Sequence, residues 1–203
     1  MVNDPSGNPR GLRSDPPGYP RELESDVALR DGTLVRIRAI LPEDAPRLVA
    51  AYDRLSAQSA YQRFFAVMRR LPPDWARFHA TVDYRQRLAL IAERGVEQEM
   101  ELLAVARYEP SDDDAPEIAL AILDAWQNRG LGTALLRALL AAGQARGIRK
   151  FRAWVLADNT RMLDLIHRHG EIERRRREGA AVELIFTPRS PVTAPPAPTP
   201  RSA

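Results

Sequence analysis

The chain has 203 residues, 44% of them hydrophobic, a length that allows one domain with a core large enough to fold unaided. Its 30 basic and 27 acidic residues leave a formal net charge of +3, and acids interleave with the bases almost everywhere except at residues 174–177, so no nucleic-acid-binding stripe is predicted. The lack of cysteine excludes disulfides, thiolate metal sites and a cysteine nucleophile, and is typical of a cytoplasmic protein.

Proline marks the two ends of the chain. Eleven of the 17 prolines lie in residues 1–20 or 188–203, and these segments lack the hydrophobic periodicity that would offset the entropy cost of ordering them. We therefore predict a disordered tail over residues 1–26, a folded domain over residues 27–187 and a disordered Pro-rich tail over residues 188–203. The start of the chain lacks the features of a secretory signal, and no apolar run approaches the roughly 20 residues that span a membrane.

The first half of the domain is predicted to hold strands and two or three short helices. Alternation of apolar and polar residues indicates a half-buried strand, and proline followed by acidic residues indicates helix starts. The expected elements are a strand at residues 33–40, helices from about residue 42, at residues 56–65 and after residues 72–74, and strands at residues 88–93 and 102–108 joined by a polar turn at residues 94–101.

The second half alternates strands and helices. The expected elements are an acidic loop at residues 111–114, a strand at residues 117–123, an amphipathic helix at residues 131–146 closed by Gly147, a strand at residues 150–156, a helix at residues 160–168 ending at Gly170, and a hairpin of residues 172–177 and 181–186 around a turn at residues 178–179. This order predicts a mixed α/β domain, with parallel pairing around each crossover helix and antiparallel pairing elsewhere.

Residues 117–136 carry the most informative motif, because a strand runs straight into QNRGLG (residues 127–132) where a helix opens. Two glycines let the backbone approach an anion, the free N–H groups of the first helical turn point at it, and Arg129 can add a charge-assisted contact. A P-loop would need Gly-Lys-Ser/Thr where this chain has GTA (residues 132–134). A dinucleotide fingerprint would need a glycine where Leu135 stands. Neither of these two motifs is present.

The QNRGLG loop resembles the acetyl-CoA pyrophosphate loop of the GNAT superfamily of N-acetyltransferases. Asn159 strengthens the resemblance, since it follows the next strand, where an asparagine typically contacts the cofactor in that family. LRDGT, RAILPED and SAYQRFF (residues 29–33, 38–44 and 59–65) resemble one branch in particular, the bacterial protein-lysine acetyltransferase (Pat-like) domain, which is often fused to an acyl-CoA-synthetase-like domain. The resemblance spans nearly the whole predicted domain.

The resemblance implies a GNAT fold, a mixed α/β sheet of six to seven strands flanked by helices. Its two central strands, here residues 117–123 and 150–156, would be splayed to hold acetyl-CoA, whose pantetheine arm would fill the gap like an extra strand. The cofactor-binding residues that the resemblance implies are Leu120, Ala121, Ile122, Gln127, Asn128, Arg129, Gly130, Leu131, Gly132, Thr133 and Asn159.

Glu117 is the predicted general base. Acetyl transfer needs a neutral amine, whereas a free lysine titrates near 10.4, so a base must take its proton. Glu117 lies where the lysine acetyltransferase branch carries a glutamate, and it shares one strand face with Ala119 and Ala121, which leave space for an acceptor side chain. Partial burial would raise the pKa of its carboxyl toward that of a useful base. The alternative is an exposed glutamate at the start of a strand.

Other positions offer weaker candidates. Trp154 stands where some GNAT relatives carry a glutamate, and Ile166 stands where a tyrosine often acts as the leaving-group acid. His167 and His169 end a helix, where cationic partners for the last carbonyls are ordinary, and two histidines without an acid at ligand spacing do not predict a metal site. Trp126 is interpreted as packing at the exit of a strand.

Two further segments have both a structural and a functional interpretation. RFF (residues 63–65) can position substrate, although an aromatic pair at a helix end is more often part of the core. The run of four arginines at residues 174–177 alternates faces along a strand, so only half of it can form one patch. A solvated hairpin is the default for that run, and attraction of an acidic protein substrate is the alternative.

Together these observations predict an enzyme, an acetyl-CoA-dependent N-acetyltransferase that acetylates a protein lysine ε-amine by direct transfer in a ternary complex. Glu117 would be the base, backbone amides would stabilise the oxyanion, and an acyl-CoA-synthetase-like protein is one candidate acceptor. No metal, nucleic-acid partner or membrane partner is expected, and the oligomeric state is left open. The alternatives are a small-molecule amine N-acetyltransferase and an acyl-CoA-binding module without turnover.

Overall fold

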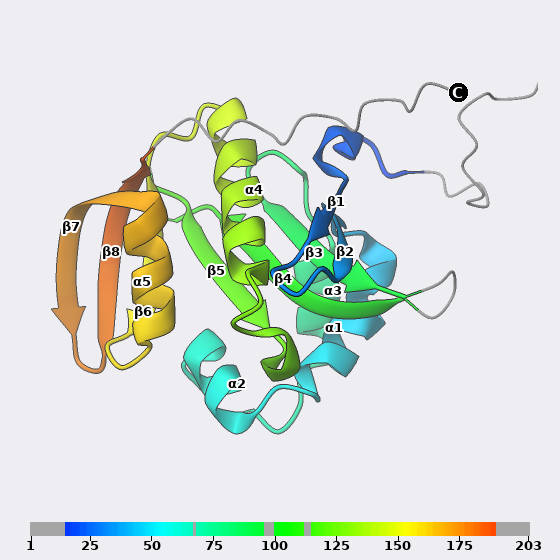
Figure 1. Ribbon diagram of the computed structural model, residues 1–203, viewed down its shortest axis with the longest axis horizontal. Helices are drawn as coiled ribbons and strands as arrows, with labels where there is room; N and C mark the ends of the chain where they lie inside the picture. Colours follow the sequence, from blue (N-terminus) through cyan, green and yellow to red (C-terminus); the bar gives the residue numbers. More distant parts are fainter. Residues whose placement is uncertain (1–14, 67, 96–99, 112–114, 190–203) are drawn as a thin grey trace, which may run out of the picture.

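The computed structural model describes residues 15–66, 68–95, 100–111 and 115–189. An eight-stranded open sheet runs through this part of the chain and carries helices on both faces (Figure 1). The mixed α/β class is therefore confirmed, with more strands than the six to seven expected. The strands are β1 (Ser25–Ala28), β2 (Leu34–Ala39), β3 (Leu88–Arg94), β4 (Glu101–Glu109), β5 (Glu117–Ile122), β6 (Phe151–Leu156), β7 (Gly170–Glu178) and β8 (Ala181–Pro188).

The helices lie at or close to the predicted positions. The three short helices near the start each begin beside a proline or a serine that fixes the first turn. The α-helices are α1 (Ala45–Tyr52), α2 (Ala57–Phe64), α3 (Pro73–Ala80), α4 (Leu131–Ala145) and α5 (Thr160–His169), and the 3₁₀ turns are η1 (Arg21–Leu23), η2 (Pro42–Asp44) and η3 (Asp124–Trp126). No helix in the described ranges is long and apolar enough to cross a membrane.

The sheet has the strand order β1-β2-β3-β4-β5-β6-β8-β7, and its one parallel junction is between β5 and β6. This junction follows from the crossover through α4, whereas the other described neighbours are antiparallel. The parallel register consists of a single pair, Glu117 with Arg152, next to a bond from the Arg152 amide to the carbonyl of Pro116 at 2.9 Å. Beyond that pair β5 and β6 separate, as the predicted splay requires.

Each face of the sheet has its own core. α4 and α5 cover one face, and α1 and α3 cover the other, as Figure 1 shows with α4 in front of the sheet and α1 behind it. β3 lies between the two cores, and its residues from Leu88 to Ala92 are fully buried. A strand that is covered on both faces needs a continuous apolar run, which is why β3 reads as LALIA rather than as an alternating pattern.

The helix α4 matches its prediction because its leucines recur at helical spacing. It begins at Leu131, immediately after Gly130, and its last turn is followed by Gly147, whose φ of +86° is the left-handed conformation that ends many helices. The side chains that α4 buries against the sheet are Leu131, Leu135, Leu136, Leu139 and Leu140. This packing fixes the helix N-terminus at the end of β5.

The N-terminal boundary differs from the prediction. Residues 15–26, assigned to a disordered tail, instead contain η1 and the first residues of β1, which pairs with β2. Tyr19 anchors this segment, since its ring packs edge-on against Tyr84 at 5.5 Å and its hydroxyl donates to Glu24 at 3.1 Å. A four-residue strand after a proline-rich stretch carries too little periodicity to be predicted.

Several predicted segments fall wholly or partly on residues that the structure does not describe. At the two ends of the chain these are the remaining parts of the predicted tails, residues 1–14 and 190–203. Within the domain, the polar turn predicted at residues 94–101 and the acidic loop predicted at residues 111–114 lie partly outside the described residues.

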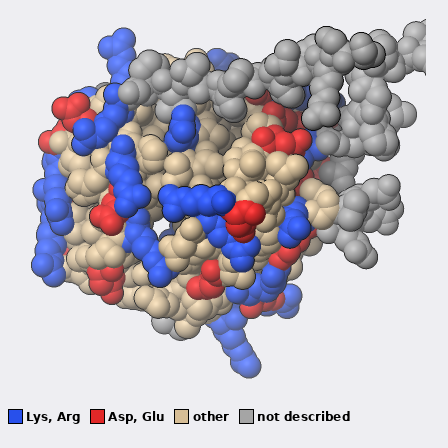
Figure 2. All heavy atoms as spheres, in the orientation of Figure 1, with Lys and Arg blue, Asp and Glu red and all other residues tan. Residues whose placement is uncertain are grey.

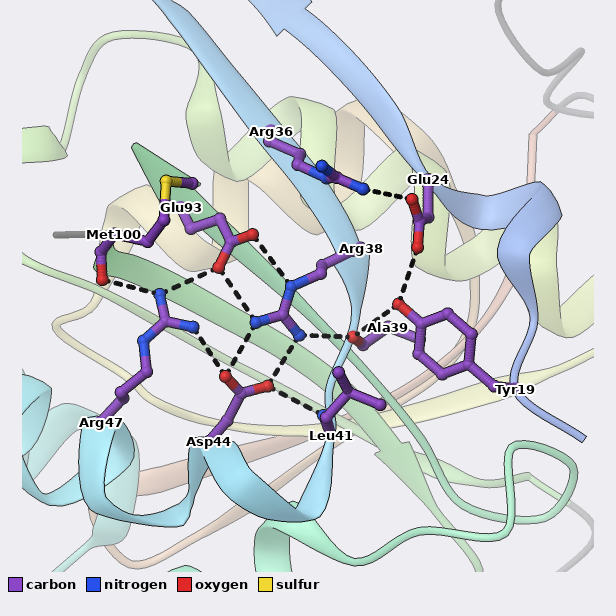
Figure 3. A network of polar contacts seen from close by, with 10 residues as sticks. All are labelled: Tyr19, Glu24, Arg36, Arg38, Ala39, Leu41, Asp44, Arg47, Glu93 and Met100. Carbon is purple, nitrogen blue, oxygen red and sulfur yellow. Dashed lines mark hydrogen bonds and ion pairs between the residues drawn. The ribbon is translucent and has the colours of Figure 1, made fainter. Parts of the chain in front are cut away.

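A buried cluster of charges joins β2, β3 and the start of α1 (Figure 3). The Arg38 guanidinium donates to both carboxylate oxygens of Asp44, at 2.7 and 2.8 Å, and to both of Glu93, at 2.9 and 3.0 Å. Its fifth N–H bonds to the carbonyl of Ala39 at 3.0 Å, and Arg47 closes the cluster from the next helical turn. All five donors of Arg38 are therefore satisfied.

Candidate active site

A cavity of about 730 Å³ occupies the region where β5 and β6 separate. Its walls come from β4, β5, β6, α2, α3, α5 and the N-terminus of α4. In the space-filling view an opening is visible between the two halves of the molecule, with basic side chains along its rim (Figure 2). A cavity of this size at a break in an α/β sheet is a typical place for a ligand.

One end of the cavity is the loop that leads into α4. Gly130 has a φ of +94° and precedes the first turn, which no described side chain caps. A Cβ atom on Gly132 would lie 3.1 Å from Ile122 and 3.5 Å from Leu165, so a larger residue there would crowd both neighbours. The backbone amides of this first turn are thus open to an anion, and a phosphate suits them in both charge and size.

Most of the predicted cofactor residues border this cavity. Those that do are Leu120, Ala121, Ile122, Gln127, Asn128, Gly130, Gly132, Thr133 and Asn159. The other two do not, since Leu131 is buried in the core under α4 and Arg129 turns away to pair with Asp31 at 3.1 Å and to stack over Trp126 at 4.9 Å. Any contribution of those two residues to a ligand would come from their backbone.

Two of the predicted residues also have structural tasks. The side chain of Gln127 donates to Ser59 Oγ and to the carbonyl of Ile122, both at 3.1 Å, and accepts from Arg161 at 2.7 Å. Asn159 caps α5 by accepting from the amide of Met162 at 3.2 Å. These bonds join α2, β5 and α5 around the cavity, so Gln127 stabilises the site as well as lining it.

The position of α2 is fixed by a contact that the sequence did not reveal. Asp124, in η3, accepts from the amide of Ser56 at 2.9 Å and from the hydroxyls of Ser56 and Ser59, both at 2.8 Å. Burial alone would raise the pKa of Asp124, but these bonds lower it below its ordinary value, which keeps the carboxylate charged. The contact holds α2 against the end of β5, and the last turn of α2 carries Arg63.

Glu117 borders the cavity at the point where the strands part. It is half-buried, and no described residue donates a hydrogen bond to its carboxylate. Burial raises the pKa of Glu117 above its ordinary value; Arg63 opposes the shift and Glu109 adds to it. Ala119 and Ala121 face the α2 side together with it and line a smaller adjoining cavity, so the predicted common face exists.

A second group of charged residues lies next to Glu117, on β4 and α3. Glu109 stands directly opposite Glu117 in the β4–β5 register, and Arg107 stands opposite Ala119. The Nε atom of Arg107 is 2.8 Å from Glu109 Oε1, and His79 Nδ1 is 3.4 Å from the same oxygen. Burial alone would raise the pKa of Glu109, but His79 and Arg107 lower it to about 2. Sequence reasoning missed this group because it depends on the strand register.

Residues 54–170 match the sequence profile of the acetyltransferase (GNAT) family, which is more than half of the chain. The chain belongs to this family. The GNAT family uses acetyl-CoA as its acyl donor, and the fold described above is the GNAT fold with its separated central strands.

Several relatives resemble this GNAT chain closely. The GNAT domain of S. lividans PAT is 36% identical, with a TM-score of 0.75, over 83% of this chain and 99% of its own. The protein named Acetyltransferase Pat of Mycolicibacterium smegmatis is 28% identical over 164 residues, 80% of this chain and 48% of its own length. Acetyltransferase PA5475 of Pseudomonas aeruginosa is 29% identical over 139 residues, 68% of this chain and 75% of its own length. The chain thus spans about half the length of the M. smegmatis relative.

The weaker catalytic candidates have clear places in this GNAT fold. Trp154 lines the cavity from β6, whereas Ile166 is fully buried in the core and presents no polar group. His167 bonds the carbonyl of Leu163 at 2.7 Å in the last turn of α5, and neither it nor His169 borders the cavity. Within the described ranges, no three His, Cys, Asp or Glu side chains are grouped to hold a metal ion.

The structure also places the two segments that had both a structural and a functional interpretation. In RFF (residues 63–65), all three residues border the cavity, and Phe64 also packs edge-on against Tyr52 at 5.3 Å. The segment therefore combines both interpretations. The arginines at residues 174–177 lie along the exposed strand β7 and do not border the cavity.

Besides Arg107, three more cationic residues of the cavity wall were not predicted from the sequence. They come from the β1–β2 turn and from α5, and they are Arg30, Arg161 and Arg168. The Arg30 side chain passes close to the α4 loop, 3.5 Å from where a Cβ of Gly130 would lie. The LRDGT sequence (residues 29–33) does not predict this contact. The turn lies between β1 and β2, and the pairing of β1 with β2, which was not predicted, brings it to the loop before α4.

Proposed function

We propose that this GNAT protein is an acetyl-CoA-dependent N-acetyltransferase whose acceptor is a protein lysine ε-amine and whose general base is Glu117. The observation that carries the proposal is the position of Glu117, on the cavity wall where β5 and β6 part. The loop suited to phosphate lies at the opposite end of the same strand. Five residue steps along β5 separate the two ends, roughly 17 Å at 3.3 Å per residue.

The residues present fit acetyl-CoA as the donor. Its pyrophosphate would be held by the amides at the start of α4, with Arg30 and Arg161 near enough to contribute charge. Its pantetheine arm would run along Leu120, Ala121 and Ile122, in the place of the strand that β5 lacks on that side. When bound, it supplies the acetyl group as an activated thioester.

Glu117 would accept the proton that the acceptor amine must lose. Burial raises the pKa of Glu117 above the ordinary value, which makes it a stronger base than an exposed glutamate, and the nearby Arg63 limits the rise. The ammonium proton would pass to Glu117 directly or through water, and the neutral amine would then attack the thioester carbonyl. As the N–C bond forms and the C–S bond breaks, CoA would leave as its thiolate and take up the second amine proton. Backbone amides of the separated strand are the candidate donors to the developing oxyanion.

A protein lysine is favoured as acceptor by exposed aromatic side chains at the rim of the cavity. Phe65 and Trp75 border the cavity and remain 39% and 52% exposed, respectively. Exposed aromatic side chains of this size are typical of surfaces that contact another protein. The similarity to proteins named Pat, together with the family branch that the sequence resembles, supports the same acceptor class. We propose the cytoplasm as its location, since the cysteine-free chain fits a reducing compartment.

An acetylation screen tests the proposal directly. The purified protein would be incubated with acetyl-CoA and, separately, with acyl-CoA-synthetase-like proteins, unrelated proteins, polyamines and free amino acids, and products would be identified by mass spectrometry. We expect acetyl-lysine at defined positions of a protein acceptor. Acetylation of small amines alone would support the small-molecule alternative instead. Binding of acetyl-CoA without any acetylated product would support the binding-module alternative.

A further inference from the structure

Arg63 is a cavity residue whose guanidinium has no polar partner. It lies in the last turn of α2 and borders the cavity beside Glu117. Across the described ranges, it donates no hydrogen bond and has no carboxylate at ion-pair distance. Its guanidinium carbon lies over the Phe64 ring, 4.8 Å from the ring centroid. The residue is partly exposed, and burial lowers the pKa of its guanidinium below the ordinary value, with Glu117 and Glu109 opposing that shift.

The stacking on Phe64 leaves the hydrogen-bonding edge of Arg63 available. A guanidinium is planar, and its N–H groups point outward in the plane, so contact of one face with a ring does not use them. The next residue, Phe65, has a φ of +54°, an uncommon conformation for a bulky side chain. This left-handed residue ends α2 and turns the chain away at the cavity, which leaves the Arg63 side chain on its wall.

The charges around Arg63 do not balance within the cluster. Glu109 is shared by Arg107, at 2.8 Å, and Arg87, at 3.5 Å. Glu117 is the other carboxylate whose field reaches Arg63. The cluster of Arg63, Arg87, Arg107, Glu109 and Glu117 therefore carries three guanidinium groups and two carboxylates, and has a surplus of one positive charge at neutral pH.

An acceptor amine makes this imbalance larger. It enters as an ammonium group and gives its proton to Glu117, so a positive charge arrives at a place that already has one in excess. His79, the remaining titratable group of the cluster, cannot compensate, because burial lowers its pKa and keeps the imidazole neutral at pH 7. A negative group on the acceptor itself would balance the charge and would give Arg63 the planar, two-oxygen partner that a guanidinium prefers.

We infer that Arg63 is a specificity residue that binds a carboxylate of the acceptor, so that the enzyme selects amines accompanied by a nearby carboxylate. This inference rests on the proposed amine acetylation and adds its substrate class. The carboxylate can come from an acidic residue next to an acceptor lysine or from the acceptor's own α-carboxylate. Both present the same chemistry to Arg63.

Two matched pairs of acceptors separate these sources and test the inference. The first pair is a blocked peptide with Glu-Lys and the same peptide with Gln-Lys. The second is Nα-acetyl-lysine and its N-methylamide, which differ in the free carboxylate. We expect the carboxylate member of at least one pair to have a kcat/KM about 10- to 100-fold higher with the wild type, the usual worth of a hydrogen-bonded charge pair. The pair that shows the preference identifies the source.

The variants then assign the preference to one side chain. Arg63→Gln should abolish the preference, bringing the ratio of kcat/KM within each pair close to one, because any effect of losing Arg63 on the pKa of Glu117 falls equally on both members of a pair. Arg63→Lys should keep part of the preference, because it keeps the charge without the planar pair of donors. Arg54→Gln is the matched control, since Arg54 is exposed, pairs with Glu101 and does not border the cavity.

Four outcomes would contradict the inference or its basis. A wild type that acetylates both members of each pair equally would overturn the inference alone, and so would a preference that survives in Arg63→Gln. A wild type that binds acetyl-CoA but acetylates none of the four acceptors and no protein in the screen would overturn the proposed function instead. If Arg63→Gln does not fold, Arg63→Lys decides, because an unchanged preference in that variant would mean that the geometry of the guanidinium plays no part.

Discussion

Arg38 and Arg63 lie in the same domain but in opposite electrostatic settings. Arg38 uses all five of its donors on Asp44, Glu93 and a carbonyl (Figure 3), whereas Arg63 has none of its donors engaged among the described residues and faces a cavity. Burial disfavours the charge on both, but the two carboxylates raise the pKa of Arg38, while the pKa of Arg63 is lowered. The two arginines thus differ in whether the fold itself engages the donors of the guanidinium group.

The difference separates residues that support the fold from residues that are available to a ligand. Buried polar groups are nearly always satisfied in folded proteins, so an unsatisfied one calls for an explanation. The Arg38 cluster is complete without any ligand, and none of its residues borders the cavity. The Arg63 and Glu117 side chains have no hydrogen-bond partner among the described residues and border the cavity, so they are available to a charged ligand. The following predictions test this division, from the largest expected effect to the smallest.

Removing the satisfied guanidinium should cost the most stability. Arg38→Met leaves Asp44 and Glu93 buried without their partner, and breaking such a cluster typically costs about 3–5 kcal/mol. Arg63→Met removes a cation that has no partner, so the loss should stay below about 1 kcal/mol. Urea unfolding of both variants measures the contrast. Equal losses would mean that Arg63 also supports the fold and would remove the distinction between the two clusters.

The two clusters should also respond oppositely to pH. Burial alone would raise the pKa of Asp44, but Arg38 lowers it below 3.8 in the folded state. Its contribution to stability is therefore present above the unfolded pKa and is lost as pH falls through the folded one. Glu117 has a raised folded pKa, so ionising it disfavours the folded state, and Glu117→Gln should be at least as stable as the wild type at pH 7.

Unfolding free energies between pH 3 and pH 7 measure this response. The Asp44→Asn variant should lose stability at pH 7 and should show a flatter decline toward acid than the wild type. A Glu117→Gln variant that is clearly less stable than the wild type at pH 7 would mean that Glu117 has a structural partner in the fold.

The loop at the start of α4 should govern cofactor binding without governing the fold. Acetyl-CoA at about 100-fold excess over its Kd should stabilise the wild type by about 2.7 kcal/mol. Gly130→Asp should abolish that increase, since it adds bulk and a negative charge where the phosphates would lie. Gly147→Asp is the matched control, because Gly147 also has a positive φ but lies at the other end of α4. Thermal melts with and without acetyl-CoA measure this stabilisation for each variant. Equal stabilisation of the two variants by acetyl-CoA would contradict the account.

An exposed arginine should show the smallest effect. Arg54 is 51% exposed at the side chain and pairs with Glu101 on the surface, and exposed ion pairs contribute about 0–1 kcal/mol. Arg54→Gln should therefore change stability and turnover only within experimental error. A large loss of stability or of turnover in Arg54→Gln would contradict the view that the role of an arginine in this domain follows from whether the fold satisfies its donors.

The sequence predicts what depends on local pattern. Helix α4, strand β5 and the loop between them follow from leucine spacing, strand alternation and the glycines at residues 130 and 132. Family resemblance then extends this to the whole fold. The short strand β1 was missed because four residues carry almost no periodic signal.

The charged part of the site depends on strand register, which the sequence does not display. Arg107 lies in the strand predicted at residues 102–108 and Glu109 just beyond it, and neither was predicted as a site residue, although their spacing of two places them on one face of a strand. Only the pairing of β4 with β5 brings that face beside Glu117. The anchoring of α2 by Asp124 was missed for the same reason, since it joins residues that are more than 60 positions apart.

The most direct test of the account is the turnover of Glu117→Gln. This variant keeps the size of the side chain but removes the proton acceptor, so acetyl-CoA binding and stability should persist while acetylation falls by about 10²- to 10⁴-fold at neutral pH. At high pH, where much of the amine is already neutral, the variant should recover part of its deficit. Turnover equal to that of the wild type at neutral pH would show that Glu117 is not the base.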